Sequence, residues 1–119
     1  MPELHDLQLL LRSRTPIVVI ESIEEPRVVE LFTRLSLDER EDSFQWTATD
    51  GLRRLEANFP PIPGTNAPGD ALRHIRGLSR GGRFLLLDFH PYLEDPLHIR
   101  LIKEIAQGYE EVPRTLVFV

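Results

Sequence analysis

The feature that most constrains the fold is a run of four apolar residues at positions 84–87, bounded by Gly81-Gly82 before it and Pro91 after it. Four apolar residues between such breakers are too few for a helix, and they predict a short strand that is buried on both faces. In open α/β sheets, ligands bind beyond the carboxyl ends of strands of this kind. Asp88, which follows the run directly, therefore stands where a functional residue is expected.

Three other segments have strand-like composition. Ile17–Ile20 is β-branched or apolar throughout and is predicted to be a fully buried strand, as is Thr115–Val119. Ser43–Thr47 alternates apolar and polar residues, which predicts a half-buried or edge strand. A turn is expected at Asp50-Gly51, and the residues after it are compatible with a short strand or with the start of a helix.

Helical periodicity appears in four places, with apolar residues spaced three and four apart. We expect helices over about 4–13, from Pro26 onward, over 69–79 and over 95–109, and an irregular mobile loop over the proline-rich residues 58–69. The apolar residues predicted to face inward are Leu4, Leu7, Leu10, Leu11, Val28, Leu31, Phe32, Leu35, Leu72, Ile75, Leu78, Leu101, Ile102, Ile105, Ala106 and Tyr109.

This alternation of strands and helices is typical of a mostly parallel sheet with helices on its faces. We therefore predict an α/β fold, a three-layer sandwich that forms a single domain over residues 1–119. Because a core strand reaches the last residue, we also expect the chain to be a piece of a longer protein.

Composition excludes several classes of function. The chain has no cysteine, so it cannot form disulfides, thiolate metal sites or cysteine nucleophiles. No segment approaches the roughly 20 apolar residues that span a bilayer, and the acidic N-terminus lacks the basic region of a signal peptide, which predicts a cytoplasmic location. A net charge of -5 argues against general nucleic-acid binding.

Basic residues outnumber acidic ones in the middle of the chain, where residues 51–93 hold 6 arginines against 3 carboxylates. Arg73, Arg76 and Arg80 follow the spacing of one helix face, and Arg53 and Arg54 lie upstream. The spacing favours a solvated helix face over a docking patch, which remains the alternative. Trp46 is expected in the core rather than in a ligand platform.

Nucleotide binding by this chain is not expected. The segment Gly64–Asp70 has the glycine spacing of a P-loop, but Asp70 stands where the phosphate-binding lysine is required. After the strand at Ile17, where a P-loop belongs, the chain has Glu21, Glu24 and Glu25, which would repel a triphosphate. We therefore expect a pocket at the head of the sheet that is lined with carboxylates and contains no ammonium group.

Asp88 resembles the magnesium-binding carboxylate that follows a buried strand in P-loop ATPases, but Phe89 stands where an acidic catalytic partner would be. Two alternatives use Asp88 directly. One is a receiver-like phosphoacceptor, in which Glu21, Glu24 or Glu25 helps to hold magnesium. The other is a metal-dependent hydrolase that uses Asp88 and His90; Asp95 and His98 are further ligand types nearby, but the Asp-x-His spacing is unspecific.

Nearly the whole chain resembles a known family. The motifs Thr49-Asp50-Gly51-Leu52-Arg53-Arg54 and Asp88-Phe89-His90-Pro91-Tyr92-Leu93-Glu94-Asp95-Pro96, with Glu24-Glu25-Pro26-Arg27-Val28 and the segment 6–18, look like the N-terminal region of AAA+ ATPases related to the plastid "hypothetical chloroplast frame" ATPase. The resemblance implies an accessory domain with a sheet like that of a degenerate P-loop ATPase core lacking the P-loop. Its strands would lie parallel, in the order Ile17, Thr115, Arg83 and Ser43, with Asp88 beside the glutamate-rich loop.

The resemblance implies no catalytic, cofactor-binding or metal-binding residue within this chain. ATP and magnesium would bind to a downstream module of the parent ATPase. The expected partners are other proteins or that module, reached through the basic face around Arg53, Arg54 and the helix at 69–79, and full-length homo-oligomers are compatible with this role. Neither a membrane nor a nucleic acid is an expected partner.

Overall fold

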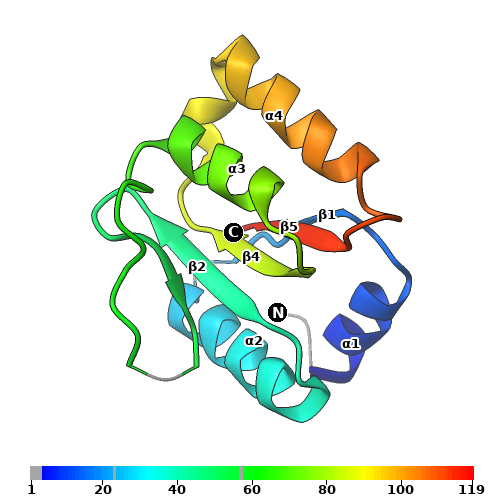
Figure 1. Cartoon of the computed structure of the whole chain (residues 1–119). Helices are drawn as coiled ribbons and strands as arrows, with labels where there is room; N and C mark the ends of the chain where they lie inside the picture. Colours follow the sequence, from blue (N-terminus) through cyan, green and yellow to red (C-terminus); the bar gives the residue numbers. More distant parts are fainter. Residues whose placement is uncertain (1–3, 23, 57) are drawn as a thin grey trace.

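The computed structural model describes residues 4–22, 24–56 and 58–119, which form one five-stranded sheet with helices on both faces (Figure 1). The strands are β1 (Ile17–Val19), β2 (Ser43–Thr47), β3 (Gly51–Arg54), β4 (Gly82–Leu86) and β5 (Arg114–Phe118), in the order β1-β5-β4-β2-β3. Strands β1, β5, β4 and β2 are parallel to one another, and β3 runs antiparallel to β2. The predicted α/β sandwich and the predicted order of its four parallel strands are confirmed.

The helices form the two outer layers. Helices α1 (Leu4–Arg12) and α2 (Glu25–Glu39) cover one face, and α3 (Pro68–Gly77) and α4 (Pro96–Gln107) cover the other (Figure 1). A short 3-10 helix, η1 (His90–Glu94), precedes α4. The predicted ends of the last two helices are displaced by one or two residues. No helix in the described ranges combines the length and the apolar character that crossing a membrane requires.

Strand β4 holds the two cores of the molecule together, because its side chains alternate between them. Phe84 and Leu86 pack in the core beneath α3 and α4, whereas Leu85 and Leu87 pack in the core beneath α1 and α2. All four side chains are at most 3% exposed. The prediction of a strand buried on both faces is confirmed for this segment.

The prediction of a fully buried strand is wrong for Ile17–Ile20. β1 lies at the edge of the sheet, where Ile17 is 37% and Val19 is 68% exposed, while Val18 and Ile20 are buried against the α1/α2 core. An apolar run cannot distinguish a central strand from an edge strand that buries one face.

Helix α1 departs from its prediction at one position. Leu7 and Leu11 are buried as expected, but Leu10 is 42% exposed, because the helix rests on the sheet with a narrower stripe than the sequence indicates. The side chain of Leu4, which was predicted to face inward as well, lies outside the description.

Strand β2 is not an edge strand, although its alternating apolar and polar residues predicted a half-buried or edge strand. It lies between β4 and β3, so Ser43, Phe44 and Trp46 are buried. The residues after the predicted turn at Asp50-Gly51 form a strand, β3, and not the start of a helix, which was the other possibility. β3, rather than β2, is the edge strand on this side of the sheet. The expectation that Trp46 belongs to the core is confirmed.

The proline-rich segment is irregular, as predicted, up to the start of α3 at Pro68. It is nevertheless bound to the sheet. Ile62 N donates to Leu52 O at 2.7 Å, Trp46 Nε1 donates to Thr65 O at 2.9 Å, and Thr65 is 2% exposed. These bonds indicate an anchored loop rather than the mobile one expected from its prolines.

Candidate functional site

The carboxyl end of β4 leads into a tight turn at Asp88. This residue has φ of 56°, a left-handed conformation that aspartate tolerates better than most residues. Its backbone N–H donates to Val119 O at 3.4 Å, and its side chain is exposed to solvent. The turn thus presents a carboxylate beyond the carboxyl ends of the strands, where the sequence predicted a functional residue.

A groove of about 760 Å³ lies beside Asp88, between β1, the end of β5 and α4. Its floor and walls are mainly apolar, with Val19, Ile102 and Phe118 among the lining residues. Polar side chains stand at its rim: Glu21, Asp88, His90 and Lys103. We call this cavity the carboxyl-end groove.

The sequence predicted part of this rim correctly. Asp88 does lie beside the loop after β1, since Glu21 lines the same groove. The expected absence of an ammonium group is wrong, however, because Lys103 lines it too. Residues 99, 102 and 103 share one face of α4 through the three- and four-residue spacing of a helix, and that face looks onto β1.

The metal and phosphoacceptor alternatives find no support in this geometry. Of the three glutamates proposed to hold magnesium, Glu21 lines the groove with Asp88, whereas Glu24 and Glu25 do not. In the described ranges, no three His, Asp or Glu side chains gather as a metal site requires.

Two of the predicted ligand types have structural partners instead. Asp95 caps α4, since its Oδ1 accepts from Leu97 N at 2.9 Å. His98 is buried, with Nδ1 2.6 Å from Tyr92 O and Nε2 3.7 Å from Asp95 Oδ2. These contacts join η1 to α4, so Asp95 and His98 hold the first turn of α4 in place.

The predicted basic face is largely neutralised by carboxylates. Arg54 Nη2 lies 3.1 Å from Glu56 Oε1 and 2.7 Å from Asp42 Oδ1, and the hydrogen bond to Glu56, with the charge of Asp42, raises the pKa of Arg54. The other pairs are Arg73 with Asp70 at 3.2 Å, Arg76 with Glu104 at 2.7 Å and Arg80 with Asp42 at 3.7 Å. Within the described part of the chain, Arg53 forms no ion pair. The face therefore carries less free positive charge than its sequence indicates.

Asp50 and its motif form the β2–β3 turn. Asp50 N donates to Thr47 Oγ1 at 3.1 Å, and Asn66 Nδ2 donates to Thr49 O at 2.9 Å. Gly51 has φ of 79°, and a Cβ there would lie 2.7 Å from Thr65 Oγ1. Contact between the turn and the proline-rich loop is thus the visible role of this motif, and no sequence pattern indicated that Thr65 is its partner.

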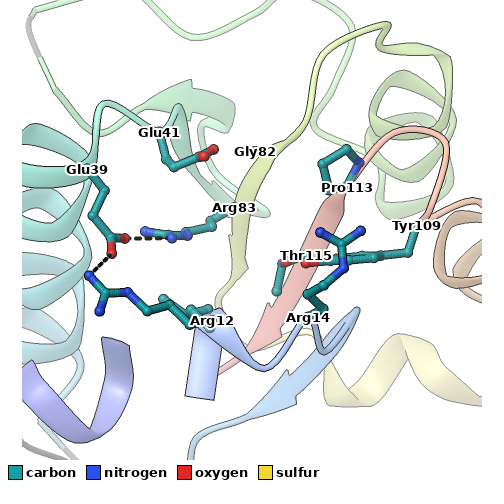
Figure 2. Close-up of a pocket in the computed structure, with 10 residues that line it drawn as sticks. Arg12, Arg14, Glu39, Glu41, Gly82, Arg83, Tyr109, Pro113 and Thr115 are labelled. Carbon is teal, nitrogen blue, oxygen red and sulfur yellow. Dashed lines mark hydrogen bonds and ion pairs between the residues drawn. The ribbon is translucent and has the colours of Figure 1, made fainter. Parts of the chain in front are cut away.

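A second cavity, of about 320 Å³, lies at the amino ends of β4 and β5 (Figure 2). Glu39 accepts from Arg83 at 2.7 Å and pairs with Arg12 at 3.5 Å, and the Arg14 guanidinium lies 5.4 Å from the centre of the Tyr109 ring. Sequence reasoning missed this site, because its residues come from segments far apart in the chain. The ion pairs tie α1, α2 and β4 together.

Comparison with known proteins agrees with the family resemblance. The model of the SpoVK-like AAA ATPase N-terminal domain matches residues 3–119. An uncharacterized AAA domain-containing protein ycf46 from Pyropia yezoensis is 33% identical over 107 residues, and one from Trieres chinensis is 29% identical over 119 residues.

The two matches cover 86% and 96% of this chain but 21% and 23% of the relatives, so the chain spans about a fifth of their length. No solved structure matches the chain significantly. The family model covers nearly every residue, including both motifs discussed above. The chain therefore belongs to the family of SpoVK-like AAA ATPase N-terminal domains.

Proposed function

We propose that this domain is a non-catalytic accessory domain of a AAA+ ATPase. It recruits a partner protein or contacts a neighbouring subunit, while a downstream module of the parent protein binds and hydrolyses ATP with Mg²⁺. Family membership supports this role, as does the length of the ycf46 relatives, about four-fifths of which lies outside the match.

The observation that carries the proposal is the connection between β1 and α2. β1 ends at Val19 and α2 begins at Glu25, which leaves residues 20–24 to join them. A P-loop needs a glycine-rich stretch of about eight residues that ends in lysine and serine or threonine. Residues 20–24 contain neither glycine nor lysine and cannot form such a cradle, and Glu24 and Glu25 occupy the positive end of α2 that would otherwise attract phosphate.

Lys103 is the feature that weighs against the proposal, since it supplies a cation to the carboxyl-end groove. A single exposed ammonium group faces Glu21 and Asp88 there, so the rim as a whole remains acidic. A triphosphate would therefore meet two carboxylates for one lysine, and the electrostatic argument against nucleotide binding holds despite the correction.

Other parts of the proposal follow from the sequence. Kinship with a degenerate P-loop ATPase core, which the family resemblance implies, stays a prediction. Contact with a partner through the face around Arg53, Arg54 and α3 stays a prediction, although ion pairs with carboxylates reduce the free positive charge of that face. A cytoplasmic location and homo-oligomers of the full-length protein also stay predictions.

Isothermal calorimetry of the 119-residue chain with ATP and Mg²⁺ tests the proposal. We expect no heat of binding at nucleotide concentrations up to about 1 mM, a range in which even weak sites are occupied. Micromolar affinity would overturn the accessory role. The Lys103→Ala variant is the control, because a heat that disappears in this variant would place the nucleotide in the carboxyl-end groove.

A further inference from the structure

We propose that the exposed edge of β1 is a docking site for an extended, basic segment of a partner protein, which adds a strand to the sheet. The inference rests on the proposed function in one respect, that the domain contacts a protein. It specifies the surface, the binding mode and the chemistry of the partner.

The first observation is the free backbone edge. Leu116 N donates to Pro16 O and Ile20 N donates to Phe118 O, both at 2.8 Å. Because successive residues of a strand direct their backbone groups to opposite sides, Ile17 and Val19 point theirs away from β5. Among the described residues these outward groups have no hydrogen-bond partner, and β1 is the last strand on this side of the sheet.

The second observation is that a cavity flanks β1 on each face of the sheet. The carboxyl-end groove, about 760 Å³, lies on the α4 side, where Ile17, Val19 and Ile99 are 37%, 68% and 36% exposed. A cavity of about 360 Å³ lies on the α1 side, lined by Leu10 and Val19 among others. An added strand directs alternate side chains to opposite faces, so each cavity would receive every second side chain.

Charge identifies the occupant. The rims of the two cavities carry three carboxylates, those of Asp6, Glu21 and Asp88, against the one ammonium group of Lys103. Glu21 lines both cavities at the carboxyl end of β1. A segment with apolar residues at alternate positions and lysine or arginine at its ends matches this surface in shape and charge. An acidic or purely polar segment does not.

The test uses a peptide probe of about nine residues, in which valine and threonine alternate between terminal lysines. Added to the isotope-labelled 119-residue chain, it should shift the amide resonances of residues 17–21 and of 99–103 on α4. Absence of shifts at about 1 mM probe, or shifts centred on another surface, would refute the docking site.

A matched pair of variants tests the backbone contact. Val19→Pro removes the outward N–H without touching the bonds to β5, and should weaken probe binding about tenfold, whereas Val19→Thr keeps the N–H and should bind within about threefold of the parent. Equal binding by both variants would contradict strand addition. Should Val19→Pro fail to fold, a fully N-methylated probe, which cannot donate to the outward carbonyls of β1, tests the other set of bonds in the same ladder on the intact protein. Undiminished binding by that probe would also contradict strand addition.

Glu21→Lys tests the contribution of charge. It should weaken binding of the basic probe and strengthen binding of a probe whose terminal lysines are replaced by glutamates. An unchanged preference for the basic probe would remove charge as the reason for its selection. Failure of these experiments would leave the accessory role open to contact at another face. ATP binding in the calorimetric experiment would remove that role without affecting the edge of β1.

Discussion

Gly51 shows at the scale of one residue why a family motif need not be a chemical site. Its φ of 79° is costly for any residue with a side chain, and Thr65 fills the space where a Cβ would stand. The Thr49–Arg54 motif therefore has a structural explanation in a turn that must be both left-handed and closely packed.

Gly51→Ala should accordingly destabilise the fold by about 1–3 kcal/mol, since it combines backbone strain with a contact of 2.7 Å. Urea unfolding followed by tryptophan fluorescence measures the change. Gly77→Ala is the matched control, because a Cβ at Gly77 meets no atom within 4 Å and alanine is the better helix residue at the end of α3. It should leave stability unchanged or raise it by up to about 1 kcal/mol. Equal effects at both glycines would contradict this account.

Glu104 pairs with two arginines, Arg76 of α3, which joins the two helices, and Arg100 of its own helix α4. Oε2 accepts from Arg100 at 3.0 Å and Oε1 accepts from Arg76 at 2.7 Å. The hydrogen bond to Arg100, followed by that to Arg76, lowers the pKa of Glu104 below its ordinary value of 4.5. A carboxyl whose pKa is lowered by folding stabilises the native state when it is ionised.

The contribution of Glu104 should therefore be complete above its ordinary pKa and should disappear as the pH falls through the lowered value. We expect Glu104→Gln to be less stable than the parent near pH 7, and we expect this difference to shrink as the pH falls through the lowered pKa of Glu104. Thermal unfolding of the two proteins across this range provides the measurement. A difference in stability that stays constant with pH would show that the ion pairs contribute nothing.

At the scale of elements, one buried hydroxyl is among the groups that anchor the proline-rich loop. Thr65 Oγ1 accepts from Leu52 N at 2.9 Å and donates to Ile62 O at 2.7 Å, so it connects the loop to β3. Both partners belong to the part of the molecule that also encloses Trp46.

Thr65→Val keeps the shape of the side chain but leaves the Leu52 N–H without its acceptor. We expect a loss of about 1–3 kcal/mol in the free energy of unfolding, and faster amide exchange at Leu52. Thr33→Val is the control, because the Thr33 hydroxyl bonds to Val29 O within its own helix and α2 keeps its backbone bonds without it. A loss no larger than that of the control would mean that the loop is held without this hydroxyl, by its apolar contacts and by the bonds from Ile62 N to Leu52 O and from Trp46 Nε1 to Thr65 O.

The contrast between β4 and β1 shows what the sequence could predict about elements. Both are apolar runs of strand length that the sequence identified as strands, and the family resemblance implied their correct order in the sheet. The burial predicted for β4 was correct, but the sequence could not show that β1 is buried on one face only, because the exposed face of β1 depends on which strands α4 covers. The same limit affected the site. The expected strand order placed Asp88 beside Glu21, but Lys103 lies in their groove because of the way α4 packs on the sheet, which no local sequence pattern encodes.

At the scale of the whole molecule, one sheet separates two cores that have no residue in common in the described part of the chain. The core under α3 and α4 contains Trp46, whereas the core under α1 and α2 contains Val28 and Phe32. Adjacent residues of β4 supply both cores, so neither can lose its packing without disturbing the strand at the centre of the sheet. The molecule should therefore unfold in a single transition.

Leu85→Ala tests this coupling, because Leu85 is fully buried in the core that does not contain Trp46. The substitution should cost about 2–5 kcal/mol, and the transition seen by Trp46 fluorescence should move to lower denaturant as far as that seen by far-ultraviolet circular dichroism. Leu86→Ala, from the other face of the same strand, should give a loss of similar size and the same coincidence of the two signals. If Leu85→Ala moved the dichroism transition while the fluorescence transition stayed in place, the two layers would be separate folding units. The edge strand β1, whose buried side chains belong to the α1/α2 core, would then open while the α3/α4 core stayed folded, and the docking edge would be lost without a change in the Trp46 signal.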